Sequence, residues 1–479
     1  MSYISINYYC IVAIATLLYY LFPLKYRWTV LLTISVVFYY KFYYKGGWLL
    51  LATILVSYGC SLAIEKVNDS MKRVFLTIGV VFVVIPWFFT RDITAFSWGL
   101  IKSNPINLVI PMGISFYTLQ IIAYMVDVYK GKVQPQRNLL KYVLFISYFP
   151  QILQGPIPRY EQLQNQLVEG HKFDEHNFSK GICYIIWGFF LKLVIADKAG
   201  VFVNTVYGNY PAYAGAYLWV ASILYSIQLY ADFLACTILA KGVSKLFGVE
   251  LIDNFMQPYF ATSIKDFWRR WHISLSTWLR DYIYIPLGGN RKGQLSKFMN
   301  LLITFFISGL WHGAGFRFIA WGMLHAFYQI IGELTNPVRE EIYVKLRVAK
   351  DSKDKAIFKR IGTFLLVDCA WVLFRADSLR QGLGILKNMF FVLNPWVLFN
   401  NRIYTLGLDW KDWLVLILGI LVMIYAGIKH EAGISVTDAV IARRLPIRWA
   451  IMIAAIVVVM LMGTYGYGFN NSDFIYGGF

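Results

Sequence analysis

The sequence predicts an all-α protein that crosses a membrane many times. Of its 479 residues, 58% are hydrophobic and only 15% are charged, whereas soluble domains have roughly 45–50% apolar and about 25% charged residues. The mean hydropathy is +0.54, and the apolar residues form long runs instead of alternating with polar ones. These observations exclude a disordered, fibrous or ordinary soluble protein and indicate a polytopic membrane protein.

A membrane-spanning helix needs about 20 apolar residues, and a series of such runs follows along the chain. The first run starts at Tyr3 without a basic residue before it, so we expect a retained membrane helix and not a signal peptide. No linker or fixed repeat divides the chain, which predicts a single membrane domain over residues 1–479. The predicted spans are Tyr3–Phe22, Trp28–Tyr44, Trp48–Ile64, Val74–Phe89, Leu108–Tyr129, Gly181–Val201, Leu218–Ala240, Leu301–Gly332, Ile357–Leu373, Trp413–Ile428 and Trp449–Met462.

Two apolar runs depart from a simple span. Leu139–Leu153 is short and contains Pro150, which predicts a partial or re-entrant helix. Leu301–Gly332 is too long for one span, and the glycines around Ser308–Gly315 predict a break or a hairpin there. The passage Phe149–Tyr160 holds three prolines and a glycine, so we expect a non-helical wall of a funnel, because irregular backbone at membrane depth must line protein or a cavity.

The net charge of +19, from 45 Lys and Arg against 26 Asp and Glu, has two explanations. In a soluble protein it would suggest a nucleic-acid partner, but basic residues also crowd the cytoplasmic loops of membrane proteins. Lys265–Lys297 and Arg339–Arg360 are heavily basic, and the aromatic and glycine-rich tail 463–479 has no Lys or Arg. We therefore predict a multi-pass protein of the cell (plasma or inner) membrane with both termini extracytoplasmic and with no nucleic-acid partner.

Cysteine and histidine usage argues against structural metal or disulfide chemistry. The five cysteines lie in or beside apolar stretches without a C-x-x-C pair, and no histidine pair stands beside a cysteine pair in a metal-ligand pattern. No metal site is therefore predicted.

The segment Phe255–Lys292 is polar and aromatic. Ser263 and Asp266 have the spacing of a capping box, and Trp268, Trp271 and Leu275 recur at helical spacing. These features predict one partly amphipathic helix at the cytoplasmic face. By composition alone, a juxtamembrane helix anchored by tryptophan and arginine is the favoured interpretation.

His312 lies between glycines in the middle of an apolar run. A titratable side chain at bilayer depth is a functional-site hypothesis by default, and histidine accepts a proton near neutral pH. A histidine that only hydrogen-bonds to another helix would explain the position equally well. For His325 we favour that helix–helix hydrogen bond.

Four segments together carry a family resemblance. They are Gln154-Gly-Pro-Ile-Pro-Arg-Tyr160, Trp268-Arg-Arg-Trp-His-Ile-Ser-Leu-Ser-Thr-Trp-Leu-Arg-Asp-Tyr282, Tyr284-Ile-Pro-Leu-Gly-Gly-Asn-Arg291 and Gly309-Leu-Trp-His-Gly313. The chain resembles the membrane-bound O-acyltransferase (MBOAT) family, above all its alginate O-acetyltransferase membrane-subunit branch, and more distantly the teichoic-acid D-alanylation subunit. The resemblance implies a ring of roughly 10–12 membrane helices, with short juxtamembrane and re-entrant helices, around a central funnel.

The resemblance also implies an activity. An acyl group, expected to be acetyl, would move from a cytoplasmic thioester across the membrane toward hydroxyls of an extracytoplasmic polysaccharide or cell-wall polymer. The donor would be acetyl-CoA or an acyl-carrier protein, and no cofactor would be bound permanently. An extracytoplasmic acyltransferase subunit and membrane lipid are the expected partners.

The family assigns roles to individual residues. His312 would be the general base, and His272 would position the donor or share the proton transfer. Arg269, Arg270 and Arg280 would meet donor phosphates, although a snorkelling or lipid-binding role explains them equally well. The predicted set of substrate- and donor-binding residues is completed by Trp268, Trp311 and Asp232.

One segment differs from the family pattern. Where the family often has Asp-Phe-Ser-Gly-Tyr-Ser-Asp, this chain reads Asp232-Phe-Leu-Ala-Cys-Thr-Ile238. Only the first two residues match, a difference that concerns the acceptor and the partner subunit more than the chemistry.

Two other classes of membrane protein are alternatives to an acyltransferase. A channel or transporter is suggested by Thr464-Tyr-Gly-Tyr-Gly468, which resembles a potassium filter, but a span immediately precedes it where a filter needs a pore helix. A non-catalytic scaffold for an extracytoplasmic transferase is the other class, and the presence of both His272 and His312 argues against it.

The tail contains a further candidate. Phe474-Ile-Tyr476 resembles the Phe-Ile-Tyr-Phe ending of the alginate and D-alanylation branches, except that Gly477 replaces the last phenylalanine. In those branches such a tyrosine is implicated as an acyl relay. A tail of roughly 14 residues can reach about 45 Å, and a phenol can be deprotonated and carry an ester. We therefore predict a transient acyl ester on Tyr476, with an interfacial aromatic anchor as the alternative.

Overall fold

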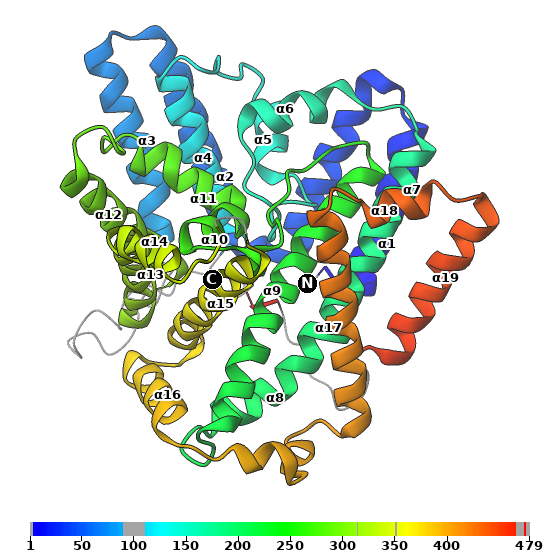
Figure 1. Cartoon of the computed structure of the whole chain (residues 1–479). Coiled ribbons are helices and arrows are strands. Elements are labelled where there is room, and N and C mark those ends of the chain that lie inside the picture. The colour runs from blue at the N-terminus through cyan, green and yellow to red at the C-terminus, as the bar shows by residue number, and fades with distance from the viewer. Residues whose placement is uncertain (1–2, 90–110, 314, 350–351, 466–473, 476–479) are drawn as a thin grey trace.

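The computed structural model describes residues 3–89, 111–313, 315–349, 352–465 and 474–475 of the chain. Within these ranges the protein consists of helices joined by turns and loops, without a β-strand (Figure 1). The all-α fold predicted from the apolar runs is therefore confirmed.

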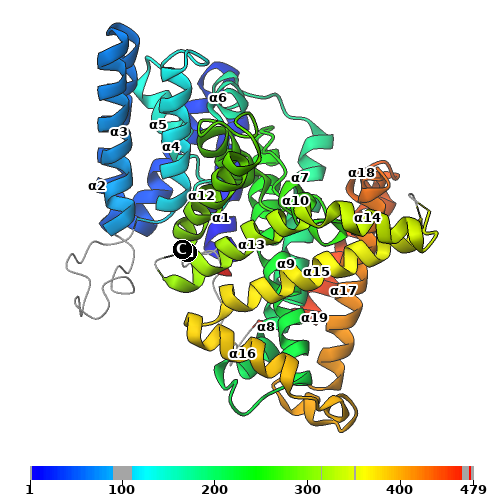
Figure 2. The same ribbon diagram turned by 60° about the vertical axis from the view of Figure 1, so that its left-hand side comes forward.

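The N-terminal helices pack side by side, with α2 in contact with α1, α3, α4 and α5 (Figure 2). The predicted spans Trp28–Tyr44 and Trp48–Ile64 both lie in α2, as two helices joined across a kink at Tyr43, where φ −140° and ψ 30° leave the helical region. The predicted partial helix Leu139–Leu153 ends before its proline, because proline cannot donate to the helical ladder. The elements are α1 (Ile6–Leu21), η1 (Leu24–Tyr26), α2 (Arg27–Lys66), α3 (Asp69–Phe89), α4 (Ile114–Tyr129), α5 (Leu139–Ser147) and α6 (Tyr160–Glu169).

The centre of the fold is built on α9, the most buried of the long apolar helices. It crosses α7 at two glycines: a Cβ on Gly181 would lie 2.8 Å from the carbonyl oxygen of Gly242, so the two backbones touch. The helix that follows α7 contains a π-helical segment, a rare conformation that frequently marks functional sites. These elements are α7 (Glu175–Phe189), the π-segment η3 (Phe190–Ala196), α8 (Asp197–Gly208) and α9 (Ala216–Leu246).

The polar aromatic segment after α9 forms two short helices instead of the single helix that we predicted. Ser263 Oγ accepts a hydrogen bond from the backbone N–H of Asp266 at 3.1 Å, which confirms the predicted cap. The break falls at His272, whose φ of 44° and ψ of 55° lie in the left-handed region. The elements are η4 (Pro258–Phe260), α10 (Ile264–Arg270), α11 (Ile273–Leu279) and the π-segment η5 (Arg280–Tyr284).

The long run Leu301–Gly332 is a hairpin, as predicted, and its two helices meet at glycines. A Cβ on Gly322 would lie 2.3 Å from the carbonyl oxygen of Phe305, and one on Gly309 would lie 2.5 Å from a carbonyl oxygen of the other helix. Backbones this close fix the crossing, and therefore the place of His312 at the turn. The two helices are α12 (Gln294–His312) and α13 (Phe316–Leu334).

The remaining helices complete the chain. Helix α15 packs on α13 and α9, and α17 and α19 lie toward the outside of the bundle (Figures 1 and 2). The elements are α14 (Asn336–Lys345), α15 (Lys353–Arg375), α16 (Leu379–Phe391), η6 (Pro395–Phe399), η7 (Arg402–Thr405), α17 (Trp410–Glu431), α18 (Val436–Ile441) and α19 (Leu445–Met462).

Six helices of the described chain are long and apolar enough to cross a membrane. Helices α1 and α4, which also coincide with predicted spans, are shorter apolar helices of 16 residues each. Helices α12, α13 and α15 coincide with predicted spans but hold more polar residues. The multi-pass membrane protein is confirmed, with fewer full-length apolar helices in the described ranges than the roughly 10–12 expected.

The hairpin makes a stability prediction. In a Gly322→Ala variant the methyl group would meet a backbone oxygen, so α12 and α13 must separate, at a cost of about 1–3 kcal/mol. We expect a lower Tm of the purified protein in detergent. Gly332→Ala is the matched control, because a Cβ at that position of the same helix meets nothing within 4 Å; its Tm should stay the same or rise slightly. Equal Tm values for the two variants would contradict the close crossing.

Candidate active site

His312 ends α12 inside a cage of aromatic rings. Its side chain is 1% exposed. The centroid of its ring lies 4.8 Å from those of Trp311 and Trp321 and 5.3 Å from that of Phe374, with interplanar angles of 80°, 85° and 78°. These are edge-to-face contacts, the favoured geometry of aromatic pairs. Packing therefore holds the imidazole in one orientation and excludes bulk water around it.

His272 is the second buried histidine, and an asparagine fixes its tautomer. Its Nδ1 lies 3.2 Å from an amide atom of Asn254, and the backbone N–H of Ser274 lies 3.1 Å from the same atom. Because an N–H can only donate, that atom is the amide oxygen, Oδ1. Nδ1 of His272 must then carry the proton and donate as well, which leaves the lone pair of the neutral imidazole on Nε2.

The surroundings of His272 keep the ring neutral. Burial lowers the pKa of His272 to about 3, because the imidazolium would lose its hydration. The left-handed backbone of this residue is held by the N–H of Ile273, which donates to the carbonyl of Asn254 at 2.9 Å. At neutral pH the site thus presents a lone pair and not a positive charge.

Trp311 lies against both histidines. Its ring centroid is 6.0 Å from that of His272 and 4.8 Å from that of His312. The indole N–H donates to the carbonyl of Ser115 on α4 at 3.3 Å. The structure therefore brings three predicted site residues into one buried group, which we call the histidine cluster: His272, Trp311 and His312.

His325 makes a hydrogen bond between helices, as predicted. Its Nδ1 accepts from the indole N–H of Trp268 at 3.3 Å. Trp321 contacts both His325 and His312, at ring centroid distances of 5.2 and 4.8 Å. His325 therefore holds Trp268 beside Trp321, one of the rings of the cage around His312, with the two indole centroids 5.8 Å apart.

A cavity of about 1320 Å³ lies next to this cluster. Trp268, Phe305 and Ser308 line its inner part, and Ser308 is one helical turn before His312 on α12. Among the described residues, neither histidine of the cluster lines the cavity. The basic side chains of the described chain that line it are Lys265, Arg269, Arg280, Lys297, Arg339 and Lys359.

The three predicted arginines do not share one environment. Arg269 and Arg280 line the cavity with largely exposed side chains. Arg270 points elsewhere: it is paired with Asp266 at 3.2 Å and with Glu431, at the end of α17, at 2.8 Å. Its place favours a structural role, and donor binding by Arg270 stays a prediction.

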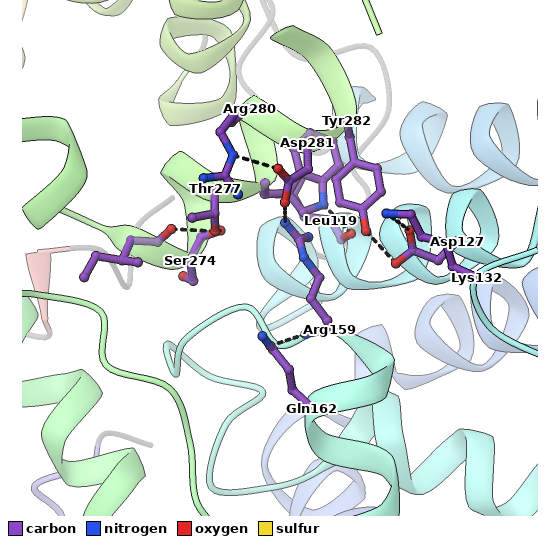
Figure 3. A network of polar contacts seen from close by, with 12 residues as sticks. Leu119, Asp127, Lys132, Arg159, Gln162, Ser274, Thr277, Arg280, Asp281 and Tyr282 are labelled. Atoms are coloured by element: carbon purple, nitrogen blue, oxygen red, sulfur yellow. Dashed lines mark hydrogen bonds and ion pairs between the residues drawn. The ribbon is translucent and has the colours of Figure 1, made fainter. Parts of the chain in front are cut away.

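Figure 3 shows how the wall formed by η5 is attached to the rest of the protein. Arg159, at the end of the proline-rich passage, donates to Asp281 at 3.3 Å, and its guanidinium lies 4.5 Å from the centroid of the Tyr282 ring. The hydroxyl of Tyr282 donates to Asp127 on α4 at 2.6 Å. The passage Phe149–Tyr160 is non-helical up to Arg159 and largely buried, as predicted, and it anchors the cavity wall.

Asp232 lies in the protein core on α9. Its Oδ1 is 2.8 Å from Nζ of Lys192, on η3, and its Oδ2 accepts the backbone N–H of Ile475 at 2.7 Å. It is not among the cavity-lining residues, and substrate binding by Asp232 stays a prediction. Tyr476, the predicted relay, lies outside the described residues.

Comparison with known proteins shows the family of the chain. Residues 135–352 match the family model of the membrane-bound O-acyltransferases. A probable alginate O-acetylase of Azotobacter vinelandii is 34% identical over 376 residues, which cover 76% of this chain and 72% of that protein. The chain belongs to the membrane-bound O-acyltransferase family. The matched region of this MBOAT protein contains both histidines of the cluster, His272 and His312.

Two further relatives extend the comparison. A probable alginate O-acetylase of Pseudomonas putida is 38% identical over 319 residues, covering 65% of this MBOAT chain and 62% of the relative. A peptidoglycan O-acetyltransferase of Helicobacter pylori is 33% identical over 365 residues, covering 70% and 68%. The alignment thus spans less than two thirds of the Pseudomonas putida relative.

Two residues of the site were absent from the sequence-based predictions. Asn254 sets the tautomer of His272 from 18 positions away, in a loop without a motif of its own. Lys192 pairs with Asp232 from 40 positions away. The signal that was available for Lys192 is its position as a lysine inside a predicted membrane span, where a charge must find a partner.

Proposed function

We propose that this MBOAT protein is an O-acyltransferase that moves an acetyl group from a cytoplasmic thioester across the membrane to hydroxyls of an extracytoplasmic polysaccharide or cell-wall polymer. The observation that carries the proposal is the buried histidine cluster next to a large cavity lined by cations. The activities for which the relatives are named, O-acetylation of alginate and of peptidoglycan, support an acetyl group and a polymer acceptor.

In this proposal His312 is the general base. Its imidazole takes the proton of the attacking hydroxyl while the oxygen bonds to the thioester carbonyl carbon. The C–S bond then breaks, and the leaving sulfur takes the proton from the imidazolium. Proton transfer of this kind contributes about 10²–10⁴-fold in rate. The rings of Trp311, Trp321 and Phe374 exclude the water that would hydrolyse the acyl group.

His272 has a supporting role in the proposed reaction. With its proton fixed on Nδ1 by Asn254, the imidazole carries its lone pair on Nε2, the ring atom that can accept a hydrogen bond. A neutral acceptor of this kind orients a hydroxyl or a thiol without stabilising a competing anion. His272 therefore positions the donor or shares the proton transfer.

The cavity is the proposed donor site. Its basic side chains attract phosphate groups, which are present on coenzyme A and on the prosthetic arm of an acyl-carrier protein alike. The inner wall of Trp268 and Phe305 is apolar and suits the acyl-pantetheine end of either donor. No cofactor is held permanently in this scheme, because the donor is consumed as a substrate.

The proposed orientation follows from the same cavity. Its basic side chains come from Lys265–Lys297, Arg339–Arg360 and their surroundings, the regions that the positive-inside rule assigns to the cytoplasm. The donor would then enter from the cytoplasm of a plasma or inner membrane, and the termini would lie outside. An extracytoplasmic acyltransferase subunit would receive the acyl group, with membrane lipid around the helices.

The proposal includes a relay through the tail. Tyr476 directly follows Ile475, whose backbone binds Asp232 in the core. The Tyr476 phenol would attack the acyl group with His312 as the base, and the resulting aryl ester would pass the acyl group to the partner. An aryl ester is a reactive intermediate because phenolate is a moderate leaving group.

Loss of the base should abolish the reaction. We expect His312→Ala to lower transfer from radiolabelled acetyl-CoA to polymer by about 10²–10⁴-fold, with an unchanged Tm as the check on folding. His272→Ala should be milder, because its role is positioning. Transfer near the wild-type rate in His312→Ala would remove this histidine from the mechanism.

The cavity arginines can be tested against a neighbour that faces away. We expect the double variant Arg269→Gln/Arg280→Gln to raise the KM for acetyl-CoA at least about tenfold, with little change in kcat. A tenfold rise corresponds to the loss of a single charge-assisted hydrogen bond to the donor. Arg270→Gln is the matched control, and its KM should change less than twofold. An equal rise in KM for both variants would mean that the effect does not come from the cavity.

The relay has its own test. Tyr476→Phe keeps the ring and deletes the nucleophile, so transfer to the polymer should stop. In the wild-type protein incubated with acetyl-CoA, mass spectrometry should find an acetyl ester on the peptide that contains Tyr476. If the Tyr476→Phe variant transfers at the wild-type rate, the tail is only an anchor.

A further inference from the structure

We propose that the buried cluster of Lys192, Asp197 and Asp232 is a binding site for Phe474 and Ile475 of the chain's own C-terminal tail, which it holds in the core beside the histidine cluster. The purpose of this site rests on the proposed function, because a relay through the tail needs the tail to be positioned. The existence of the site does not depend on the relay and can be tested without it.

The binding site is built around one ammonium group in the middle of the protein. Nζ of Lys192 lies 2.9 Å from Oδ1 of Asp197 and 2.8 Å from Oδ1 of Asp232, and the lysine is 1% exposed. Lys192 belongs to the π-segment η3, and Asp232 belongs to the facing helix α9. Asp232 has a second carboxylate oxygen that does not face Lys192, and every buried charge in this region needs partners.

Two consecutive tail residues, Phe474 and Ile475, contact this cluster. The backbone N–H of Ile475 donates to Oδ2 of Asp232 at 2.7 Å, so one carboxylate bridges Lys192 and the tail. The ring of Phe474 is buried, with its centroid 4.7 Å from Nζ of Lys192 and 6.2 Å from the ring centroid of Tyr3. The site thus recognises a main-chain N–H preceded by an aromatic side chain, through a charge-assisted hydrogen bond and a cation–π contact.

The start of the tail is attached to the same π-segment. The backbone N–H of Thr464, just after α19, donates to the carbonyl of Leu193 at 3.0 Å. Leu193 is the residue next to Lys192. Thr464 and Phe474 therefore both contact η3, and Ile475 binds Asp232, which is paired with Lys192 of η3, so the two described parts of the tail share one docking place.

The docking place is connected to the histidine cluster through α9. Phe233, the residue after Asp232, packs edge-on against His272 with ring centroids 4.7 Å apart and an interplanar angle of 90°. One turn of α9 thus carries both the carboxylate that binds the tail and a wall of the histidine cluster. A tail bound at Asp232 lies within the same packed core as His272.

The test measures the accessibility of residue 475 in the full-length protein in detergent. Ile475→Cys keeps the backbone N–H and Phe474, and the five native cysteines are replaced by alanine. The probe is a polyethylene-glycol maleimide, whose bulk prevents reaction with a docked tail. Labelling of the introduced thiol should be slow in this protein and fast after unfolding in a detergent such as dodecyl sulfate.

Two variants of this protein remove the docking contacts. Lys192→Met/Asp197→Asn/Asp232→Asn neutralises all three groups together and leaves no unpaired buried ion. Phe474→Leu keeps an apolar side chain without the ring, and provides a second result should the triple variant fail to fold. We expect labelling of the thiol at position 475 to be at least tenfold faster in the first variant and several-fold faster in the second.

The matched control neutralises a neighbouring ion pair. Lys198 and Asp412 are 2.7 Å apart, on α8 and α17, and Lys198→Met/Asp412→Asn should leave the labelling rate unchanged. Unchanged labelling in both docking variants would overturn the proposal, as would equal acceleration in the control, because the effect would then be general loosening.

Failure of this proposal and failure of the proposed function give different results. If His312→Ala or Tyr476→Phe retains acyl transfer while the docking variants still expose position 475 to the probe, the tail site stands and the mechanism fails. If the docking variants do not expose position 475 while His312→Ala loses transfer, the mechanism stands and the tail site is rejected.

Discussion

The glycine contact between α12 and α13 is the constraint on which the rest of the site depends. Gly322 has no Cβ, and a Cβ at this position would lie only 2.3 Å from the carbonyl oxygen of Phe305. The two helices can therefore form a hairpin whose backbones touch. His312 then sits at its turn, within reach of Trp321 on the opposing helix. The cage that orients the imidazole and excludes water is therefore a consequence of helix packing.

A second theme is the pairing of polar groups inside an apolar core. Asn254 accepts hydrogen bonds from His272 and Ser274, and Asp368, which is fully buried, accepts from Ser222 and Ser226 at 2.8 and 2.5 Å. Without such partners each group would be costly at this depth. The same pairing sets the tautomer of His272 and holds the backbone of Ile475 in the core. The cavity and Ile475 lie near the histidine cluster through different elements, because α10 and α12 line the cavity and α9 carries Asp232.

Much of this arrangement could be predicted from the sequence because it depends on local patterns. Apolar runs located the helices, a serine at capping spacing located the start of α10, and glycines around His312 located the hairpin turn. What could not be predicted depends on contacts between distant residues. The left-handed turn at His272 is stabilised by Asn254, which carries no motif. The π-segment that holds Lys192 has no signature in composition, and the partners of Lys192, Asp197 and Asp232, lie on other elements.

The central claim is that an acyl group passes through the protein from a donor on one side of the membrane to a hydroxyl on the other. The most direct measurement uses the purified protein in proteoliposomes, with the acceptor polymer and the partner transferase enclosed and radiolabelled acetyl-CoA supplied only outside, so that only molecules inserted with their basic face outward can use it. We expect labelled ester on the enclosed polymer while coenzyme A stays outside, and no labelled ester with His312→Ala. Ester formation only when donor and acceptor share one compartment would contradict it.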